Sequence, residues 1–165
     1  MKVMTFTILV VVFLLSSVSF AAHHMPGKSN GIAYPASWQD WATISISYRT
    51  DNNTIRVILG NDVAVKAARS GETNKWPDGA IIGKVVWKAV DLESWKAAKK
   101  PGDLVHAEFM FKDSKQYADT YGWGWARWVG LNKEPFSKGP QSCVGCHTPV
   151  KDNDWVFTIP AVFPK

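Results

Sequence analysis

The sequence predicts an α+β domain that is mainly an antiparallel β-sheet with short helices. Residues 43–48 and 54–59 both alternate apolar and polar side chains, and the turn-forming residues Asp51–Asn53 separate them, a pattern typical of a β-hairpin. A nearly continuous apolar run covers residues 80–87, and alternation returns at 105–111. Because short segments with helical patterns lie between these strands, we expect antiparallel strands joined by short helices.

The first half of the chain is predicted to form a turn, the hairpin and one helix. Ser37 is the expected N-cap of a short turn that carries Trp38 and Trp41. After the hairpin, Asn61 is the expected N-cap of a helix at residues 62–70, and Gly71 is expected to end that helix.

The second half is predicted to alternate strands with helices, beginning after the turn at residues 76–79. The expected elements are a central strand at 80–87, a helix at 91–100 that Pro101 ends, a strand at 105–111, a helix at 113–121 capped by Asp113, and a strand at 123–130.

The N-terminus has the features of an export signal. Met1 and Lys2 give a short positive start, and residues 3–15 are apolar almost throughout. That run is short for a membrane span, although an uncleaved anchor is the alternative reading. Ser19 and Ala21 provide the small residues of a cleavage site, so we expect a signal peptide at 1–21 and a single mature domain at 22–165.

The formal charge of +5 is spread along the chain, without a run of five or more Lys or Arg. Nucleic acid is therefore an unexpected partner, and no membrane contact is expected after signal cleavage. A modestly basic surface suits docking to an acidic redox partner, or it serves solubility alone.

The two cysteines form the motif Cys143-Val144-Gly145-Cys146-His147. This spacing is the c-type haem attachment signature, in which two thiols add to the haem vinyl groups and the adjacent histidine binds the iron. A local disulfide or a redox C-x-x-C site is the alternative. We therefore expect one haem c, attached at Cys143 and Cys146, with His147 as the iron ligand.

The residue opposite His147 decides what such a haem does. On the 105–111 strand, Phe109 and Phe111 share one face with Val105 and Ala107, and His106, Glu108 and Met110 share the other. If the phenylalanine face covers the haem, His106 and Met110 point away from it. The iron is then five-coordinate beneath an apolar pocket that binds small ligands such as nitric oxide or hydroxylamine, although core packing equally explains both phenylalanines.

Three further residues are candidates for the site. Lys84 places an ammonium in an apolar strand, where it is either solvated at an edge, paired, or chemically used. Arg127 lies among tryptophans, where it pairs a haem propionate or stacks on an indole; the small residues Gly124 and Ala126 on the opposite side of that strand would let a flat macrocycle approach. Glu134 is a nearby carboxylate that is either a base or a solvated loop residue.

From Tyr34 to Phe163 the order of motifs resembles the cytochrome P-460 family, which includes the cytochromes c′-beta. The motifs are W-x-x-W at Trp38, A-A-R-S-G ending at Gly71, W-P-D-G followed by I-I-G-K-V-V-W, K-D-S at Lys112, C-V-G-C-H, and D-W-V-F-T at Asp154.

The resemblance implies a homodimeric antiparallel-sheet fold with His147 as proximal ligand and an open distal site. In the P-460 branch a lysine at the position of Lys84 is bonded to the haem macrocycle, and the c′-beta branch lacks this bond and binds gases. Family chemistry implies a periplasmic oxidoreductase that oxidises hydroxylamine with the help of a base, for which Glu134 is the candidate, and passes electrons to a redox protein such as a soluble cytochrome. The alternatives are a nitric oxide-binding protein without turnover and a simple electron-transfer cytochrome with six-coordinate iron.

Overall fold

A computed structural model of the chain describes residues 27–163. The expected signal peptide and its cleavage site lie outside the described residues. No helix of the described part is long and apolar enough to cross a membrane.

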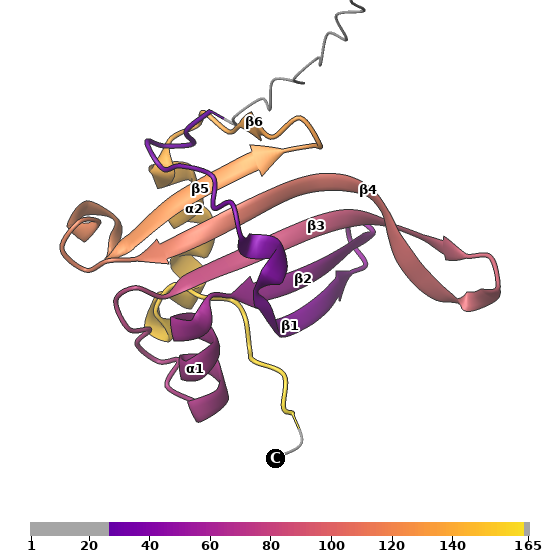
Figure 1. Cartoon of the computed structure of the whole chain (residues 1–165), viewed down its shortest axis with the longest axis horizontal. Coiled ribbons are helices and arrows are strands. Elements are labelled where there is room, and N and C mark those ends of the chain that lie inside the picture. Colours follow the sequence, from indigo (N-terminus) through magenta and orange to yellow (C-terminus); the bar gives the residue numbers. More distant parts are fainter. Residues whose placement is uncertain (1–26, 164–165) are drawn as a thin grey trace, which may run out of the picture.

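Six antiparallel strands form one sheet in which each strand pairs with the next along the chain (Figure 1). The strands are β1 (Ala42–Arg49), β2 (Thr54–Gly60), β3 (Ile81–Leu92), β4 (Trp95–Lys112), β5 (Trp123–Val129) and β6 (Glu134–Pro135). The expected hairpin, the central strand and the two later strands are confirmed, and with them the α+β class.

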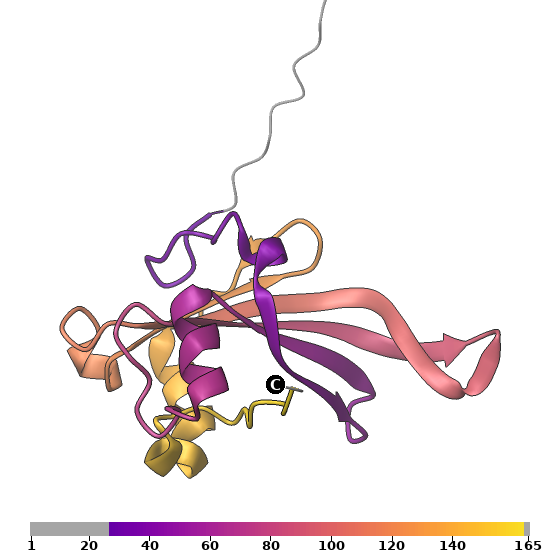
Figure 2. The ribbon, with the colours of Figure 1, turned by 60° about the horizontal axis from the view of Figure 1, so that its bottom comes forward.

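Two helices lie on one side of the sheet, and the N-terminal segment lies on the other (Figure 2). We call the side that carries α1 (Asp62–Ser70), α2 (Pro140–His147) and the C-terminal segment the inner face. The outer face carries the short 3-10 helix η1 (Trp38–Asp40).

Helix α1 forms where the sequence predicts it. The side chain of Asn61 accepts a hydrogen bond from the Ala64 N–H at 3.0 Å, and Gly71 ends the helix with φ 80°. Ala64, Val65 and Ala67 are buried on the side that faces the sheet. Asn61 also accepts from the Ile81 N–H and donates to the Gly79 carbonyl, so one residue ties α1 to the start of β3.

The predicted helix at 91–100 is wrong. Strand β3 continues to Leu92 and β4 begins at Trp95, so these residues form the tip of a long hairpin with Asp91 opposite Lys99. Pro101 lies within β4 opposite Ala89, at an irregularity in the pairing, and Ala89 donates its N–H to Asn53 instead. A proline is tolerated there because no ladder hydrogen bond depends on it.

The predicted helix at 113–121 is also largely absent. The side chain of Asp113 accepts hydrogen bonds from the N–H groups of Lys115 and Gln116, as a cap would. The chain then makes turns and only the 3-10 helix η2 (Ala118–Thr120) before Gly122 leads into β5.

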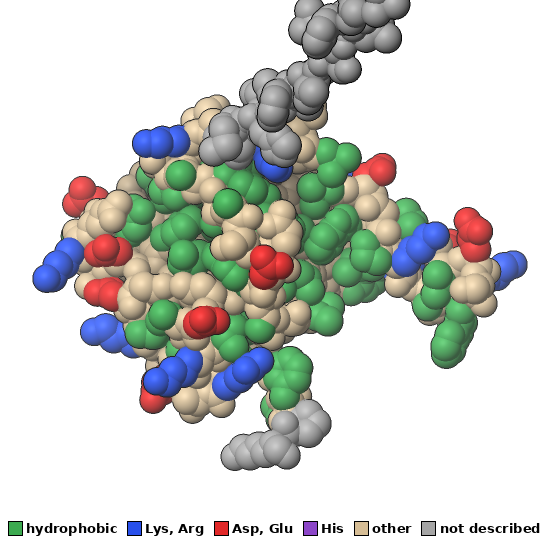
Figure 3. All heavy atoms as spheres, viewed as in Figure 1, with side chains coloured by type: hydrophobic (Ala, Val, Ile, Leu, Met, Phe, Trp, Pro, Cys, Tyr) green, Lys and Arg blue, Asp and Glu red, His purple; other side chains and the backbone are tan. Residues whose placement is uncertain are grey.

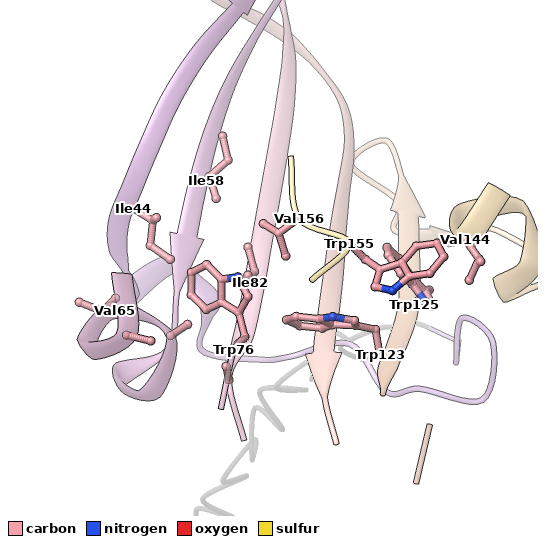
Figure 4. Packing of buried hydrophobic residues seen from close by; sticks show 13 residues of the cluster. Ile44, Ile58, Val65, Trp76, Ile82, Trp123, Trp125, Val144, Trp155 and Val156 are labelled. Carbon is pink, nitrogen blue, oxygen red and sulfur yellow. The ribbon is translucent and has the colours of Figure 1, made fainter. Parts of the chain in front are cut away.

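Each face of the sheet carries its own hydrophobic cluster. The inner-face cluster joins the sheet to α1, α2 and the C-terminal segment and is rich in tryptophan (Figure 4); its largest members are Trp76, Trp123, Trp125 and Trp155. The outer-face cluster has Leu59, Val85, Ala107, Phe109, Ala126 and Trp128 at its centre.

Candidate haem site

Helix α2 presents the Cys-x-x-Cys-His motif against the inner face. Gly139, with φ 76°, turns the chain, and Pro140 opens the helix at a position that needs no N–H partner. Val144 is buried in the inner-face cluster and anchors the helix. Both cysteines are free thiols; Cys143 is partly buried and Cys146 is exposed. Residues three and four apart lie on one side of a helix, so both thiols and His147 gather along one edge of α2.

His147 is held by the C-terminal segment and by aromatic rings. Its Nδ1 lies 2.7 Å from the carbonyl oxygen of Trp155. The rings of Trp125 and Phe157 meet the imidazole edge to face, with centroids at 4.7 and 4.9 Å. With Nδ1 occupied by a carbonyl, which can only accept, the ring carries its proton on Nδ1 and leaves Nε2 as the nitrogen that can bind iron.

The electrostatics favour the neutral imidazole that a metal needs. Burial lowers the pKa of His147; the hydrogen bond to Trp155 acts in the opposite direction, and the charges of Lys84 and Arg127 add to the lowering. Burial also raises the pKa of the Cys143 thiol.

Three charged residues form a row across the inner face. Lys84 on β3 lies directly opposite Glu108 on β4, which lies opposite Arg127 on β5. Glu108 forms an ion pair with Lys84 and accepts a hydrogen bond from Arg127 Nε at 2.6 Å. Burial acts to raise the pKa of Glu108, but the charges of Lys84 and Arg127 outweigh it and lower that pKa to about 2.

His106 and Arg56 lie beside this charged row, in the neighbouring row of the same face, where both are opposite Val86. Burial lowers the pKa of His106 to about 4, so the ring is neutral at pH 7 although its Nε2 lies 3.6 Å from a Glu108 oxygen. Arg56 lies opposite Val86 on the same face, and its Nε is buried without a hydrogen-bond partner among the described residues.

The structure brings together five of the residues that the sequence singled out. On α2, Cys143 packs against the inner-face cluster, His147 packs against Trp125, and Cys146 is exposed. The charges of Lys84 and Arg127 act on the His147 imidazole. Glu134 does not join them directly: it is exposed on the two-residue strand β6, opposite Val129, without an ion pair to a described residue. Its role as a base stays a prediction.

The two phenylalanines lie elsewhere. Phe109 is 1% exposed and packs on the outer face against Tyr34, Trp38, Trp41 and Trp128. Phe111 lies next to it in the same cluster. The expectation that this face covers the haem is therefore wrong, because strand alternation shows which residues share a face and not which face α2 will cover.

The neighbours of the two phenylalanines also lie on faces opposite to those expected relative to the haem. His106, Glu108 and Met110 lie on the inner face, where Met110 packs against the tryptophan cluster. Gly124 and Ala126 lie on the outer face; the ring of Tyr117 covers Gly124, and Ala126 is buried. The expectation that Gly124 and Ala126 leave room for a flat macrocycle is therefore wrong, because protein side chains fill the space on that side of β5.

Sequence reasoning missed Glu108. The sequence shows a carboxylate at Glu108 on one strand and a lysine at Lys84 on another. Only the register between β3 and β4 reveals that Glu108 and Lys84 lie opposite each other.

The residues present fit a covalently attached haem. Two free thiols precede a neutral histidine whose Nε2 is available, and the buried Nε1 of Trp125, next to that histidine, has no hydrogen-bond partner among the described residues. The cationic groups of Arg127 and Arg56 suit carboxylates such as the haem propionates.

Comparison with known proteins identifies the family of the chain. A search of curated proteins found no match. The family described as Cytochrome P460 matches residues 35–158, which include the sheet, α2 and the Trp155 segment. The chain therefore belongs to the Cytochrome P460 family and is a c-type haem protein.

Proposed function

We propose that the chain is a periplasmic mono-haem protein that oxidises hydroxylamine, or nitric oxide, at a five-coordinate haem iron. One haem is bound covalently through Cys143 and Cys146, with His147 as proximal ligand. The observation that carries this proposal is the arrangement of His147, with Nδ1 held by Trp155 and Nε2 available, beside the charged row of the inner face. The bound haem supplies an iron that binds the small substrate and accepts its electrons.

The surrounding residues hold the macrocycle and its charges. Arg127 and Arg56 would pair with carboxylates of the bound cofactor. Glu108 holds Lys84 and Arg127 through its two ion pairs. Lys84 is the proposed site of a second covalent bond to the macrocycle. Glu134 is the proposed base, as the carboxylate that lies nearest before the haem motif in the sequence.

One observation favours a second function. The ammonium of Lys84 is ion-paired with Glu108, and a lysine that stays in this pair leaves the macrocycle unmodified. The protein would then be a nitric oxide-binding protein of the c′-beta kind.

Peptide mapping of the purified holoprotein by mass spectrometry distinguishes the two functions. We expect haem on the peptide with Cys143 and Cys146 and also on the peptide with Lys84. The second attachment is lost in Lys84→Ala and kept in Lys88→Ala, which changes an exposed lysine of the same strand. Hydroxylamine oxidation, followed with an artificial electron acceptor such as ferricyanide, should follow the second attachment.

Each outcome of the peptide mapping and the activity assay supports or contradicts a stated function. Attachment through the cysteines alone, with nitric oxide binding and no turnover, supports the gas-binding protein. A chain that binds no haem when produced with a c-type maturation system contradicts both functions.

Export and assembly complete the proposal. We propose that the signal peptide is removed after Ala21, so that sequencing of the mature protein begins at Ala22. We also propose a homodimer and an acidic redox partner such as a soluble cytochrome. The dimer is supported by the outer face, where apolar side chains gather on the surface and the only helix of the described residues is the three-residue η1 (Figure 3).

A further inference from the structure

A buried ion pair lies next to the segment that holds His147. Lys112, the last residue of β4, donates to both carboxylate oxygens of Asp154, at 2.7 and 2.8 Å. Their side chains are only 5% and 12% exposed. Replacing such a pair by apolar residues is often neutral or stabilising, so the pair needs a reason other than stability.

The pair holds an unusual backbone conformation. Asp154 has φ 47° and Trp155 has φ 66°, so two successive residues with side chains adopt the left-handed region. Such a segment persists only where its surroundings determine it. Trp76 donates its N–H to Asp154 Oδ2 at 2.7 Å, and the Trp123 indole donates to the Asp154 carbonyl at 2.8 Å.

This conformation aims the Trp155 carbonyl at His147. The carbonyl oxygen lies 2.7 Å from Nδ1, and the residue before it is the one that Lys112 holds. The Trp155 N–H is bonded to the Val150 carbonyl at 3.0 Å, so the peptide groups on both sides of the turn are fixed. A displacement of Asp154 would move the Trp155 carbonyl relative to the imidazole.

We propose that Lys112 and Asp154 are positioning residues for the proximal ligand, and that their ion pair sets the reduction potential of the haem iron through the Trp155–His147 hydrogen bond. This inference rests on the proposed function, since it requires iron at His147 Nε2. A strong acceptor at Nδ1 makes the imidazole a better electron donor and favours ferric iron. Weakening the hydrogen bond therefore raises the potential.

The test is the variant Asp154→Asn, which keeps the shape of the side chain and removes its charge. We expect the potential to rise by the equivalent of about a tenfold change in relative affinity for the two oxidation states, about 59 mV for one electron. The iron–histidine stretching frequency of the ferrous protein, measured by resonance Raman, should fall. Lys112→Arg, which keeps the positive charge, should stay near wild type in both.

Asp91→Asn is the matched control, because it removes the carboxylate of an exposed ion pair with Lys99 on the β3–β4 hairpin. It should change neither the potential nor the frequency.

Three results would overturn the inference. The first is an Asp154→Asn variant that binds a full complement of haem and has the same reduction potential and iron–histidine stretching frequency as Asp91→Asn. If Asp154→Asn does not fold, the double variant Lys112→Met/Asp154→Asn replaces it, because it leaves no unpaired charge. The second result is a double variant whose reduction potential and iron–histidine stretching frequency equal those of wild type. The third is a wild-type ferrous holoprotein without an iron–histidine stretch, which contradicts the five-coordinate, His147-ligated iron of the proposed function.

Discussion

Glu108 shows how a single buried carboxylate organises the inner face. Its side chain is 16% exposed, so leaving water is costly, yet the charges of Lys84 and Arg127 keep it ionised with a pKa of about 2. The same carboxylate, on β4, offsets the repulsion between the two cations on the strands to either side, β3 and β5. Removing it would leave both cations partly buried and uncompensated, the costly way to break such a cluster.

Glu108→Gln should lower the free energy of unfolding by about 3 kcal/mol at pH 7. The folded pKa of about 2 lies below the ordinary value of 4.5, so the stabilisation by Glu108 is present above pH 4.5 and is lost as the pH falls toward 2. Urea unfolding of wild type and variant at pH 7, 5 and 3 should show the difference shrinking in that window.

Glu134→Gln is the matched control for that series, because Glu134 is exposed on β6 without an ion pair to a described residue. Its effect should stay within about 0.5 kcal/mol at every pH. An equal loss in both variants, or a Glu108→Gln effect that does not depend on pH, would show that Glu108 is not the charged centre of the row.

At the scale of single residues, the sequence predicts chemistry best where the chemistry is local. Cys143, Cys146 and His147 lie within five residues, and α2 holds them as their spacing predicts. Lys84 could be singled out because a lysine in an apolar strand is costly. Glu108 and Lys112 could not, because their partners come from other strands and loops. The prediction that Phe109 faces the haem is wrong because strand alternation does not show which face α2 covers.

At the scale of elements, the fold was predictable where local signals and tertiary pairing agree. Helix α1 has a cap, an apolar side and a terminating glycine, and its predicted bounds match. Residues 91–100 carry no such cap, and there pairing between β3 and β4 decides the conformation. Asp113 fulfils its capping role, but residues after it form turns because the chain must return to pair β5 with β4.

Gly124 is an element-scale contact that a methyl group should disrupt. A Cβ at Gly124 would lie 2.4 Å from the Tyr117 ring, where β5 packs against the turn before η2. Gly124→Ala should therefore lower the free energy of unfolding by about 1–3 kcal/mol, as overpacking does. Urea denaturation at pH 7 measures this loss.

Gly145→Ala provides the comparison, since a Cβ at Gly145 in α2 meets no described atom within 4 Å. It should be neutral or stabilising by up to about 1 kcal/mol, because alanine is the better helix residue. Equal stability of Gly124→Ala and wild type would mean that Tyr117 moves away at no cost.

For the whole molecule, the two faces of the sheet differ in how they are covered. The inner face is covered in part by α1, α2 and the C-terminal segment (Figure 2). Within the described residues, the outer face carries shorter segments, namely η1, the N-terminal segment and the turn with Tyr117. Trp87 and Phe111 are only partly buried there, and Ile46 at the edge is 67% exposed. An apolar face of this kind is typical of an interaction surface, which is why we assign it to the second copy of the proposed dimer.

Ile46→Lys should break this dimer without unfolding the chain. Ile46 lies opposite Val57 on the outer face and is exposed, so the substitution removes little from the monomer core but places a charge in the interface of each copy. Light scattering coupled to size-exclusion chromatography should give a dimer for wild type and a monomer for Ile46→Lys, at equal haem content. Ser47→Lys, which changes the next residue on the opposite face, should remain a dimer. A wild-type monomer, or an Ile46→Lys variant that stays dimeric at micromolar concentration, would show that the outer face is not the contact between copies.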